Sequence, residues 1–208
     1  KDGGTLTTAV TVFPSTTGPA YLPFLMGLFP GNCNMPGIRW FDKLKFSRNK
    51  GSFYSHRSYV GIEGLFFNKD IKKSQLTIFN IINKSRSIFN EITKGLPVKF
   101  DLTNISKVFH KFKSHFYGSH HIDNIASDKL LNSLESDAQF VFCCFLGVDS
   151  NSHISGCDSS TVVDSYVNFD NKLGLVVDKL IETNQLEETL LIITSDHGHS
   201  NTHTHLDL

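Results

Sequence analysis

An aliphatic segment near the end of the sequence stops at residues that can bind a metal ion. Residues 190–194 have the composition of a strand buried on both faces, and Asp196, His197 and Gly198 follow shortly after. Asp and neutral His are both good zinc ligands. Ligands of open α/β sheets bind outside the carboxyl ends of strands. Asp196 and His197 are therefore predicted to lie at the edge of the sheet where ligands usually bind. Taken alone, the tripeptide fits an ordinary turn equally well.

A second predicted strand, residues 138–146, leads into another pair of such residues. Asp149 and His153 follow it at a spacing of four. If Asp149 opens a helical turn, both side chains lie on one face, where a carboxylate and an imidazole can hold one ion. The alternative is a simple surface hydrogen bond between the two.

A third predicted strand, residues 8–13, is followed by a hydroxyl. Pro14 breaks the strand, and an apolar helix is predicted over residues 20–28, which places Thr17 near the helix N-cap. Free backbone N–H groups at such a position suit a phosphate-like anion. The alternative is that Thr17 only caps the helix.

Together, the three strand ends predict one chemistry. In a parallel sheet they share an edge, so a hydroxyl nucleophile would stand beside two Asp/His pairs. This is the layout expected of two-metal phosphoryl transfer, in which one metal lowers the pKa of the hydroxyl and the other balances charge on the transferred group.

These segments resemble a known family. Residues 13–19 (FPSTTGP), Asp149 with His153, and residues 195–198 (SDHG) are similar to the type I phosphodiesterase/nucleotide pyrophosphatase branch of the alkaline phosphatase superfamily. The resemblance implies two zinc ions, although other divalent metals are also expected to fit. It implies that Thr17 is the nucleophile and forms a phosphothreonine. Asp149 and His153 would bind one zinc, and Asp196, His197 and Thr17 the other.

The sequence departs from the family at three points. We find no counterpart of the family's metal-binding Asp before the nucleophile, nor of its late third His; His203 and His205 lie too close to Asp196 for that role. The family's phosphate-binding Asn has no counterpart either. We predict that Arg39, together with Gly18 beside the nucleophile, contacts the substrate; the alternative is that another substrate class is involved. We therefore expect a domain incomplete at both ends, with weak zinc binding and little activity by itself.

The charge is distributed unevenly although the net charge is zero. Residues 39–129 contain 17 Lys/Arg against 7 Asp/Glu. We interpret residues 43–128 as a basic, Phe-rich insert or cap. Its aromatic residues do not recur at a fixed spacing and no nucleic-acid motif appears, so a solvated face that attracts anionic substrates is favoured over nucleic-acid binding. No apolar run is long enough for a membrane span.

The remaining elements that would position these residues are mostly helices. Short apolar elements are predicted at 76–82 and 87–92, helices at 105–116 and 126–134, and a helix whose apolar stripe from Val163 to Leu180 faces the core. His110, His115, His120 and His121 are interpreted as surface residues.

The predicted fold is α/β and alkaline phosphatase-like, with a mostly parallel central sheet and helices on both faces. The predicted function is metal-dependent hydrolysis of a phosphodiester or phosphomonoester. One alternative is transfer of a phospho-group such as phosphoethanolamine to another acceptor. The other is a non-catalytic module of the same fold.

Overall fold

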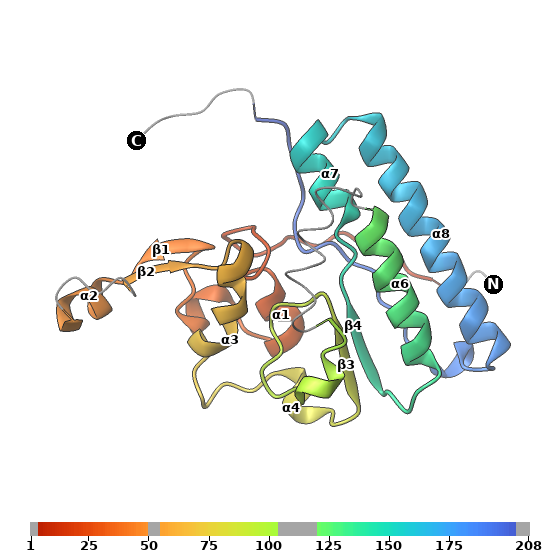
Figure 1. The fold of residues 1–208 in the computed structure, drawn as a ribbon, viewed down its shortest axis with the longest axis horizontal. Coiled ribbons are helices and arrows are strands. Elements are labelled where there is room, and N and C mark those ends of the chain that lie inside the picture. The colour runs from red at the N-terminus through yellow and green to blue at the C-terminus, as the bar shows by residue number, and fades with distance from the viewer. Residues whose placement is uncertain (1–3, 50–54, 104–119, 203–208) are drawn as a thin grey trace. The chain divides into compact units, whose positions relative to one another are not determined.

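The computed structural model describes residues 4–49, 55–103 and 120–202 (Figure 1). The chain forms two compact units. Unit 1 comprises Lys1–Lys72 with Ser195–Gly198, and unit 2 comprises Lys73–Thr194 with His199–Leu208. The short segment Ser195–Gly198 thus belongs to the unit built from the start of the chain.

Unit 1 is built from short elements around an aromatic core. Helix α1 (Tyr21–Met26) buries Leu22 and Leu25 and ends at Gly27, whose φ of 63° is easily adopted only by glycine. The other elements are the 3₁₀ helix η1 (Pro30–Cys33), α2 (Lys43–Asn49), η3 (Gly61–Phe66), α3 (Phe67–Asp70), and an antiparallel pair of strands, β1 (Arg39–Phe41) and β2 (His56–Ser58).

The core of unit 1 has one polar anchor. Tyr59 and Phe67 are buried with their rings 4.2 Å apart, and the Tyr59 hydroxyl donates to Asp70 at 2.7 Å. Arg57 forms an ion pair with the same carboxylate. Burial raises the pKa of the Tyr59 hydroxyl, so this donor stays protonated across the physiological range.

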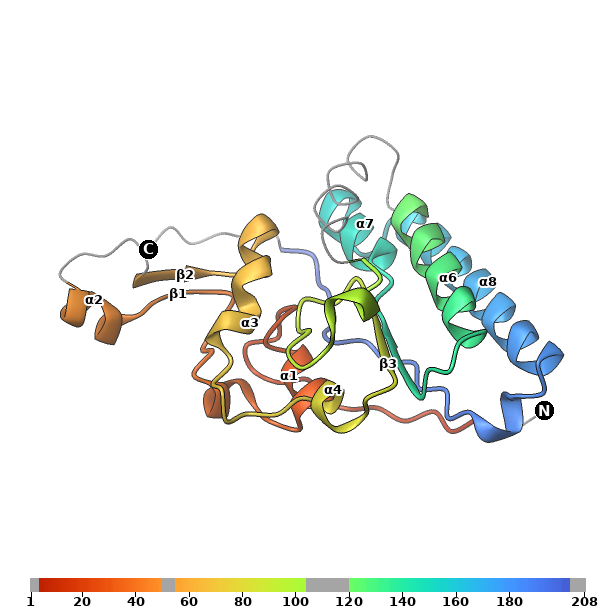
Figure 2. The same cartoon turned by 60° about the horizontal axis from the view of Figure 1, so that its bottom comes forward.

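Unit 2 combines a parallel pair of strands with three longer helices. Strand β3 (Ser85–Ile88) pairs in register with β4 (Phe140–Cys143). Helix α6 (His120–Leu134) connects into β4, and α7 (Gly147–Ser155) and α8 (Ser160–Glu182) follow it. Helices α6 and α8 run side by side (Figure 2). The short elements are α4 (Ile78–Ile81), η4 (Val98–Phe100) and η5 (Leu186–Glu188).

Several predicted elements are confirmed. The helix predicted at 20–28 corresponds to α1, the one at 126–134 to the second half of α6, and the strand at 138–146 to β4. Asp149 and His153 both lie on helix α7. The helix predicted at 105–116, with His110 and His115, falls outside the described residues.

Two predicted strands are wrong. Residues 8–13 and 190–194 form no strand, and their large side chains are mostly solvent-exposed, with Val10 99% and Leu190 83% accessible. β-Branched residues favour a strand only when a neighbouring strand pairs with them and covers them, and no described strand does so here. The structure is α/β, but in its described part the sheets are limited to the two pairs β1–β2 and β3–β4. The mostly parallel central sheet is therefore not observed.

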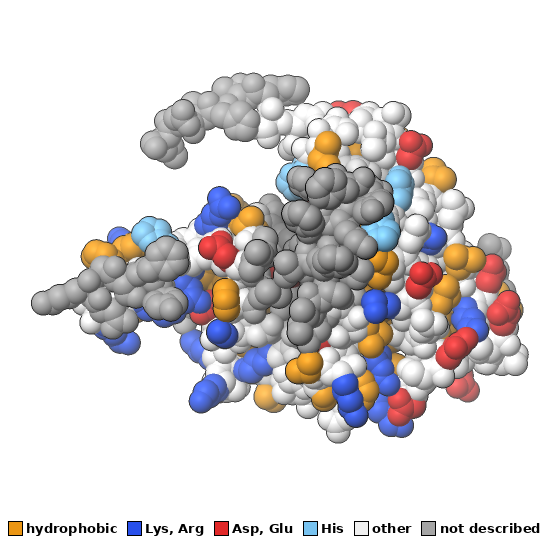
Figure 3. Space-filling view, in the orientation of Figure 1, with side chains coloured by type: hydrophobic (Ala, Val, Ile, Leu, Met, Phe, Trp, Pro, Cys, Tyr) orange, Lys and Arg blue, Asp and Glu red, His pale blue; other side chains and the backbone are white. Residues whose placement is uncertain are grey.

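The stripe predicted on α8 is buried only toward the end of the helix. Of its residues Leu180 is buried, whereas Val163, Tyr166 and Val167 are each more than half exposed. The buried residues of α8 are otherwise Val162 and Ser165 in its first half and Val176 near its end. The interpretation of the whole stripe as core is wrong for its first half. Acidic side chains gather near the end of α8 (Figure 3).

Within the described residues, no helix is both long and apolar enough to cross a membrane.

Candidate active site

Thr17 lies in the turn that leads into α1, and its side chain does not cap the helix. The turn is held by backbone hydrogen bonds from Ala20 to Thr16 and from Tyr21 to Gly18, both 3.0 Å long. The residue at the N-cap position is Ala20, with no side-chain cap. The Thr17 hydroxyl instead lies 3.1 Å from Nε2 of His197, 180 residues away. The capping alternative is therefore wrong.

His197 is oriented by its own neighbours in the sequence. Its Nδ1 lies 2.9 Å from the carbonyl oxygen of Gly198, which can only accept, so this contact requires a proton on Nδ1. The Ser195 hydroxyl donates to the His197 carbonyl, and the Thr11 hydroxyl donates to the Asp196 carbonyl. In the neutral ring Nε2 then presents its lone pair toward Thr17, which is the tautomer that a metal ligand requires.

Asp196 completes this group in unit 1. Its Oδ2 is buried without a hydrogen-bond partner among the described residues, and it lies 3.6 Å from Nε2 of His197. A buried carboxylate oxygen without a partner is costly, so a cation at this position would relieve a real deficit. Neighbouring ligand atoms of a tetrahedral zinc site are about 3.3 Å apart. The separations of 3.1 and 3.6 Å around Nε2 fit such a site.

Asp149 and His153 form a second group, in unit 2. They are one turn apart on α7, with Asp149 Oδ1 3.5 Å from His153 Nε2. Both side chains are substantially exposed. The predicted pairing is therefore present in the structure, at a separation too long for a hydrogen bond and close to that of two ligands on one metal.

His199, which no motif in the sequence indicates, is a third member of this second group. Its ring meets that of His153 edge to face, with centroids 4.5 Å apart. One ligand atom from each of Asp149, His153 and His199 lies within 4.8 Å of the others. The signal in the sequence that could have indicated this ligand is the position of His199, two residues after His197. The two histidines weighed from the sequence, His203 and His205, lie outside the described residues.

Asp123, which no motif in the sequence indicates, fixes the start of α7. Its Oδ1 on α6 accepts from the N–H groups of Leu146 and Gly147 at 2.9 and 3.1 Å. Asp123 on α6 therefore caps the N-terminus of α7, the helix that carries Asp149 and His153. Burial raises the pKa of the Asp123 carboxyl and outweighs the two backbone hydrogen bonds, which lower it. A Cβ at Gly147 would clash with Asp123 Oδ2, so a larger residue there would displace the capping carboxylate.

The two predicted substrate contacts lie in unit 1. Gly18 directly follows Thr17, is buried and has a φ of 92°, a conformation that favours glycine. Arg39 begins strand β1 and is exposed. No contact described here joins Arg39 to Thr17, and its role stays a prediction.

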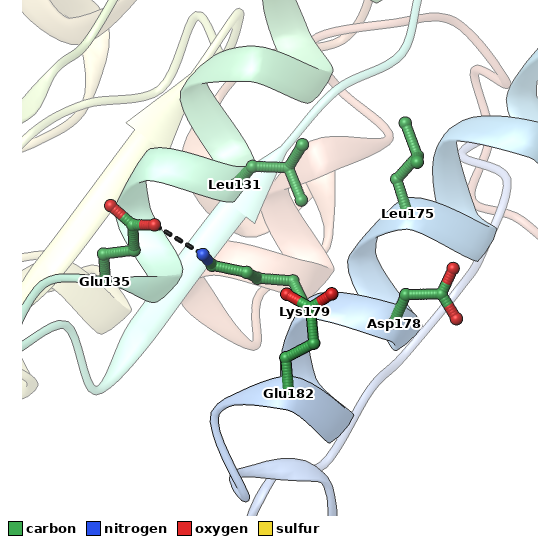
Figure 4. Close-up of a pocket in the computed structure, with 6 residues that line it drawn as sticks. All are labelled: Leu131, Glu135, Leu175, Asp178, Lys179 and Glu182. Atoms are coloured by element: carbon green, nitrogen blue, oxygen red, sulfur yellow. Dashed lines mark ion pairs between the residues drawn. The ribbon is translucent and has the colours of Figure 1, made fainter.

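A groove between α6 and α8 is unsuited to a phosphate ester. It encloses about 270 Å³ and is lined by Leu131, Glu135, Leu175, Asp178, Lys179 and Glu182 (Figure 4). Lys179 is its one cation, and its ammonium already pairs with Glu135 at 2.5 Å. That hydrogen bond raises the pKa of the Lys179 ammonium. Because three carboxylates surround one engaged lysine, the groove would repel an anionic substrate.

Comparison with known proteins identifies the family of the chain. No curated protein matches the chain. The pattern of one family, type I phosphodiesterase / nucleotide pyrophosphatase, matches residues 1–208. That match spans the Thr17 turn, the Asp149–His153 helix and the Asp196–His197 segment. The chain belongs to the type I phosphodiesterase / nucleotide pyrophosphatase family.

Proposed function

We propose that this protein hydrolyses a phosphoester by transferring the phospho-group first to Thr17 and then to water. The family indicates phosphoester hydrolysis of the phosphodiesterase/nucleotide pyrophosphatase type. The threonine intermediate and the dependence on metal are our extensions of that statement.

One observation carries the proposal. The Thr17 hydroxyl and the buried, unpartnered Asp196 Oδ2 lie 3.1 and 3.6 Å from the same nitrogen, Nε2 of His197. A threonine hydroxyl is a weak nucleophile unless a base or a metal lowers its pKa. A hydroxyl, an imidazole and a carboxylate at these separations are suited to that activation.

The proposed reaction has two displacements at phosphorus. The Thr17 hydroxyl loses its proton, its oxygen bonds to phosphorus, and the bond from phosphorus to the leaving alcohol breaks, with the alkoxide taking up a proton. Water then attacks the phosphothreonine and releases Thr17 with its proton restored. His197 orients the hydroxyl, and its own orientation is fixed by the contact between Nδ1 and Gly198.

Two groups of residues are suited to divalent metals, which we propose to be zinc. Thr17, Asp196 and His197 would hold one ion, and Asp149 and His153 would contribute to the other. A divalent ion lowers the pKa of a coordinated hydroxyl and offsets negative charge on the transferred group. The orphaned Asp196 Oδ2 supports the first assignment, and the 3.5 Å separation of Asp149 and His153 supports the second.

We assign the substrate contacts to Gly18 and Arg39. The Gly18 N–H is adjacent in sequence to the nucleophile, so it can face a phosphate oxygen carried on Thr17. The exposed Arg39 guanidinium is suited to bidentate recognition of a phosphate. The substrate is expected to be a small phosphodiester or phosphomonoester.

Turnover of model substrates by Thr17 variants tests the nucleophile. With bis-p-nitrophenyl phosphate and p-nitrophenyl phosphate in the presence of zinc, Thr17→Ala should abolish turnover, whereas Thr17→Ser should retain part of it because the hydroxyl remains. Thr8→Ala, at an exposed threonine, is the matched control and should behave as the parent. Turnover by Thr17→Ala at the parent rate would remove Thr17 from the mechanism. Adding ethanolamine and analysing products distinguishes hydrolysis from transfer.

A further inference from the structure

We propose that His199 is the third protein ligand of the metal site formed by Asp149 and His153, and that Asn201 is the residue that positions it. The proposal rests on the metal-binding role assigned above to Asp149 and His153. It does not depend on the reaction assigned to Thr17.

The three side chains make a ligand set that binds metal with an open position. Two imidazoles and one carboxylate are a common set for catalytic zinc, which keeps its fourth position for water or substrate, and they also suit other divalent first-row metals. All three residues are at least partly exposed, so an anionic ligand can reach the open position.

The geometry requires only a small adjustment to reach a bound state. The Asp149–His153 separation of 3.5 Å is already close to the spacing of about 3.3 Å between neighbouring ligands of tetrahedral zinc. The three ligand atoms lie within 4.8 Å of one another, so the widest pair closes by about 1.5 Å on binding. Rotation of exposed side chains between rotamers supplies a movement of this size.

Asn201 fastens the segment that carries His199 to the end of the helix that carries the other two ligands. Its Oδ1 accepts from the Cys157 N–H at 3.0 Å, and its Nδ2 donates to Asp158 Oδ2 at 2.7 Å. The turn Cys157–Asp158 directly follows Gly156, the C-cap of α7. Two residues of chain span at most about 7 Å, so this clamp holds His199 within reach of α7.

Gly156 makes room for the clamp. It has a φ of 81°, and a Cβ built on it would lie 3.0 Å from Asn201 Oδ1. Both the backbone conformation and the close approach favour glycine. A turn adapted in this way to one side chain indicates that the position of Asn201 is specified by the fold.

The test is a cobalt titration followed by visible absorption, with Zn²⁺ competition to obtain affinities. An Asp196→Ala background removes the other proposed site, so a single binding event is measured. His199→Asn should abolish or strongly weaken binding, as should Asp149→Asn. His56→Asn, the same change at an exposed histidine of unit 1, is the matched control and should bind as the background does.

The clamp is tested by removal and by exchange. Asn201→Ala should weaken metal binding by about 10- to 100-fold, the usual effect of losing a residue that orients a ligand. Combining Asn201→Asp with Asp158→Asn reverses the hydrogen bond and should restore affinity. Thermal melts of the metal-free variants separate this effect from a general loss of stability.

These measurements decide the proposal about His199 and Asn201 independently of the function proposed for Thr17. Unchanged affinity in His199→Asn, or no cobalt binding by the Asp196→Ala background, would overturn the ligand assignment. Unchanged affinity in Asn201→Ala, or failure of the exchanged pair to rescue, would overturn the clamp. A failed Thr17 assignment would instead appear as turnover in Thr17→Ala, whatever the cobalt titration gives.

Discussion

The proposed chemistry depends on how individual side chains in unit 1 are held. The contact of 2.9 Å between Nδ1 of His197 and the Gly198 carbonyl sets which nitrogen faces Thr17. Asp196 supplies a carboxylate oxygen that is buried yet unpartnered within the described part of the chain. A buried anion of this kind is costly without a cation. The site is therefore suited to hold positive charge beside Thr17, the proposed nucleophile.

Replacing Asp196 should reduce zinc binding. Asp196→Asn exchanges a charged ligand for a poorer neutral one, so the zinc content at a fixed concentration of free zinc should fall. The measurement is metal analysis of protein dialysed to equilibrium against a buffer that contains zinc. Asp164→Asn, an exposed Asp on α8, is the matched control and should leave the content unchanged. Equal zinc content in Asp196→Asn and the parent would eliminate this carboxylate as a ligand.

The sequence predicted some of these residues and missed others for a physical reason. Thr17 and His197 were recognised as members of one group from their types and motif, and the structure brings them to 3.1 Å. His199 and Asn201 carry no motif of their own. Their positions depend on hydrogen bonds to a turn 43 or 44 residues earlier, which local spacing does not reveal.

At the scale of elements, α7 is the helix whose position matters most in unit 2. It carries Asp149 and His153, and it begins under the carboxylate of Asp123 on α6. Apolar spacing was sufficient to predict the helices at 20–28 and 126–134, because it acts locally. The cap on α7 comes from a residue more than 20 positions away, so no N-cap signal in the sequence could have indicated it.

Asp123 should make the stability of the protein depend on pH. Its folded pKa lies above the ordinary value of 3.8, because burial outweighs the hydrogen bonds from Leu146 and Gly147. Below 3.8 the carboxyl is protonated in both states. As pH rises, the unfolded chain releases this proton first. The stability contributed by protonated Asp123 therefore falls progressively and is fully lost once pH exceeds the folded pKa.

Urea denaturation across this pH range measures the effect. Asp123→Asn keeps an oxygen acceptor but cannot ionise, so the unfolding free energy of the parent minus that of the variant should decrease as pH rises from about 4. Asp128→Asn, the same change at an exposed Asp on the same helix, is the matched control. A parent-minus-variant difference that stayed constant or increased with pH would contradict the assignment.

At the scale of the whole molecule, the charge is divided between the two units. Unit 1 has nine basic and five acidic residues, and unit 2 has eleven basic and fifteen acidic residues. The unit that contains Thr17 and Arg39 is therefore the basic one, which suits an anionic substrate. The predicted insert at 43–128 stays a prediction, and the boundary between the units, after Lys72, falls within it.

The fold class could be predicted from the sequence, but the sheet could not. Helices α1, α6 and α8 follow from local patterns, whereas residues 8–13 and 190–194 have strand composition without strand structure. Strand formation depends on partners distant in the chain, which composition does not specify. The family was predicted more reliably than the sheet, because the motif residues that indicate it can be read from the sequence whatever their backbone conformation.

The central claim is that Thr17 carries the phospho-group during turnover. Its most direct test is acid quenching of the protein during reaction with bis-p-nitrophenyl phosphate, followed by mass spectrometry of the peptide that contains Thr17. The account predicts a phosphoester on Thr17 in the parent, lost in Thr17→Ala and retained in the Thr8→Ala control. Product formation by the parent with no covalent phosphate on Thr17, or with phosphate on another residue, would contradict it.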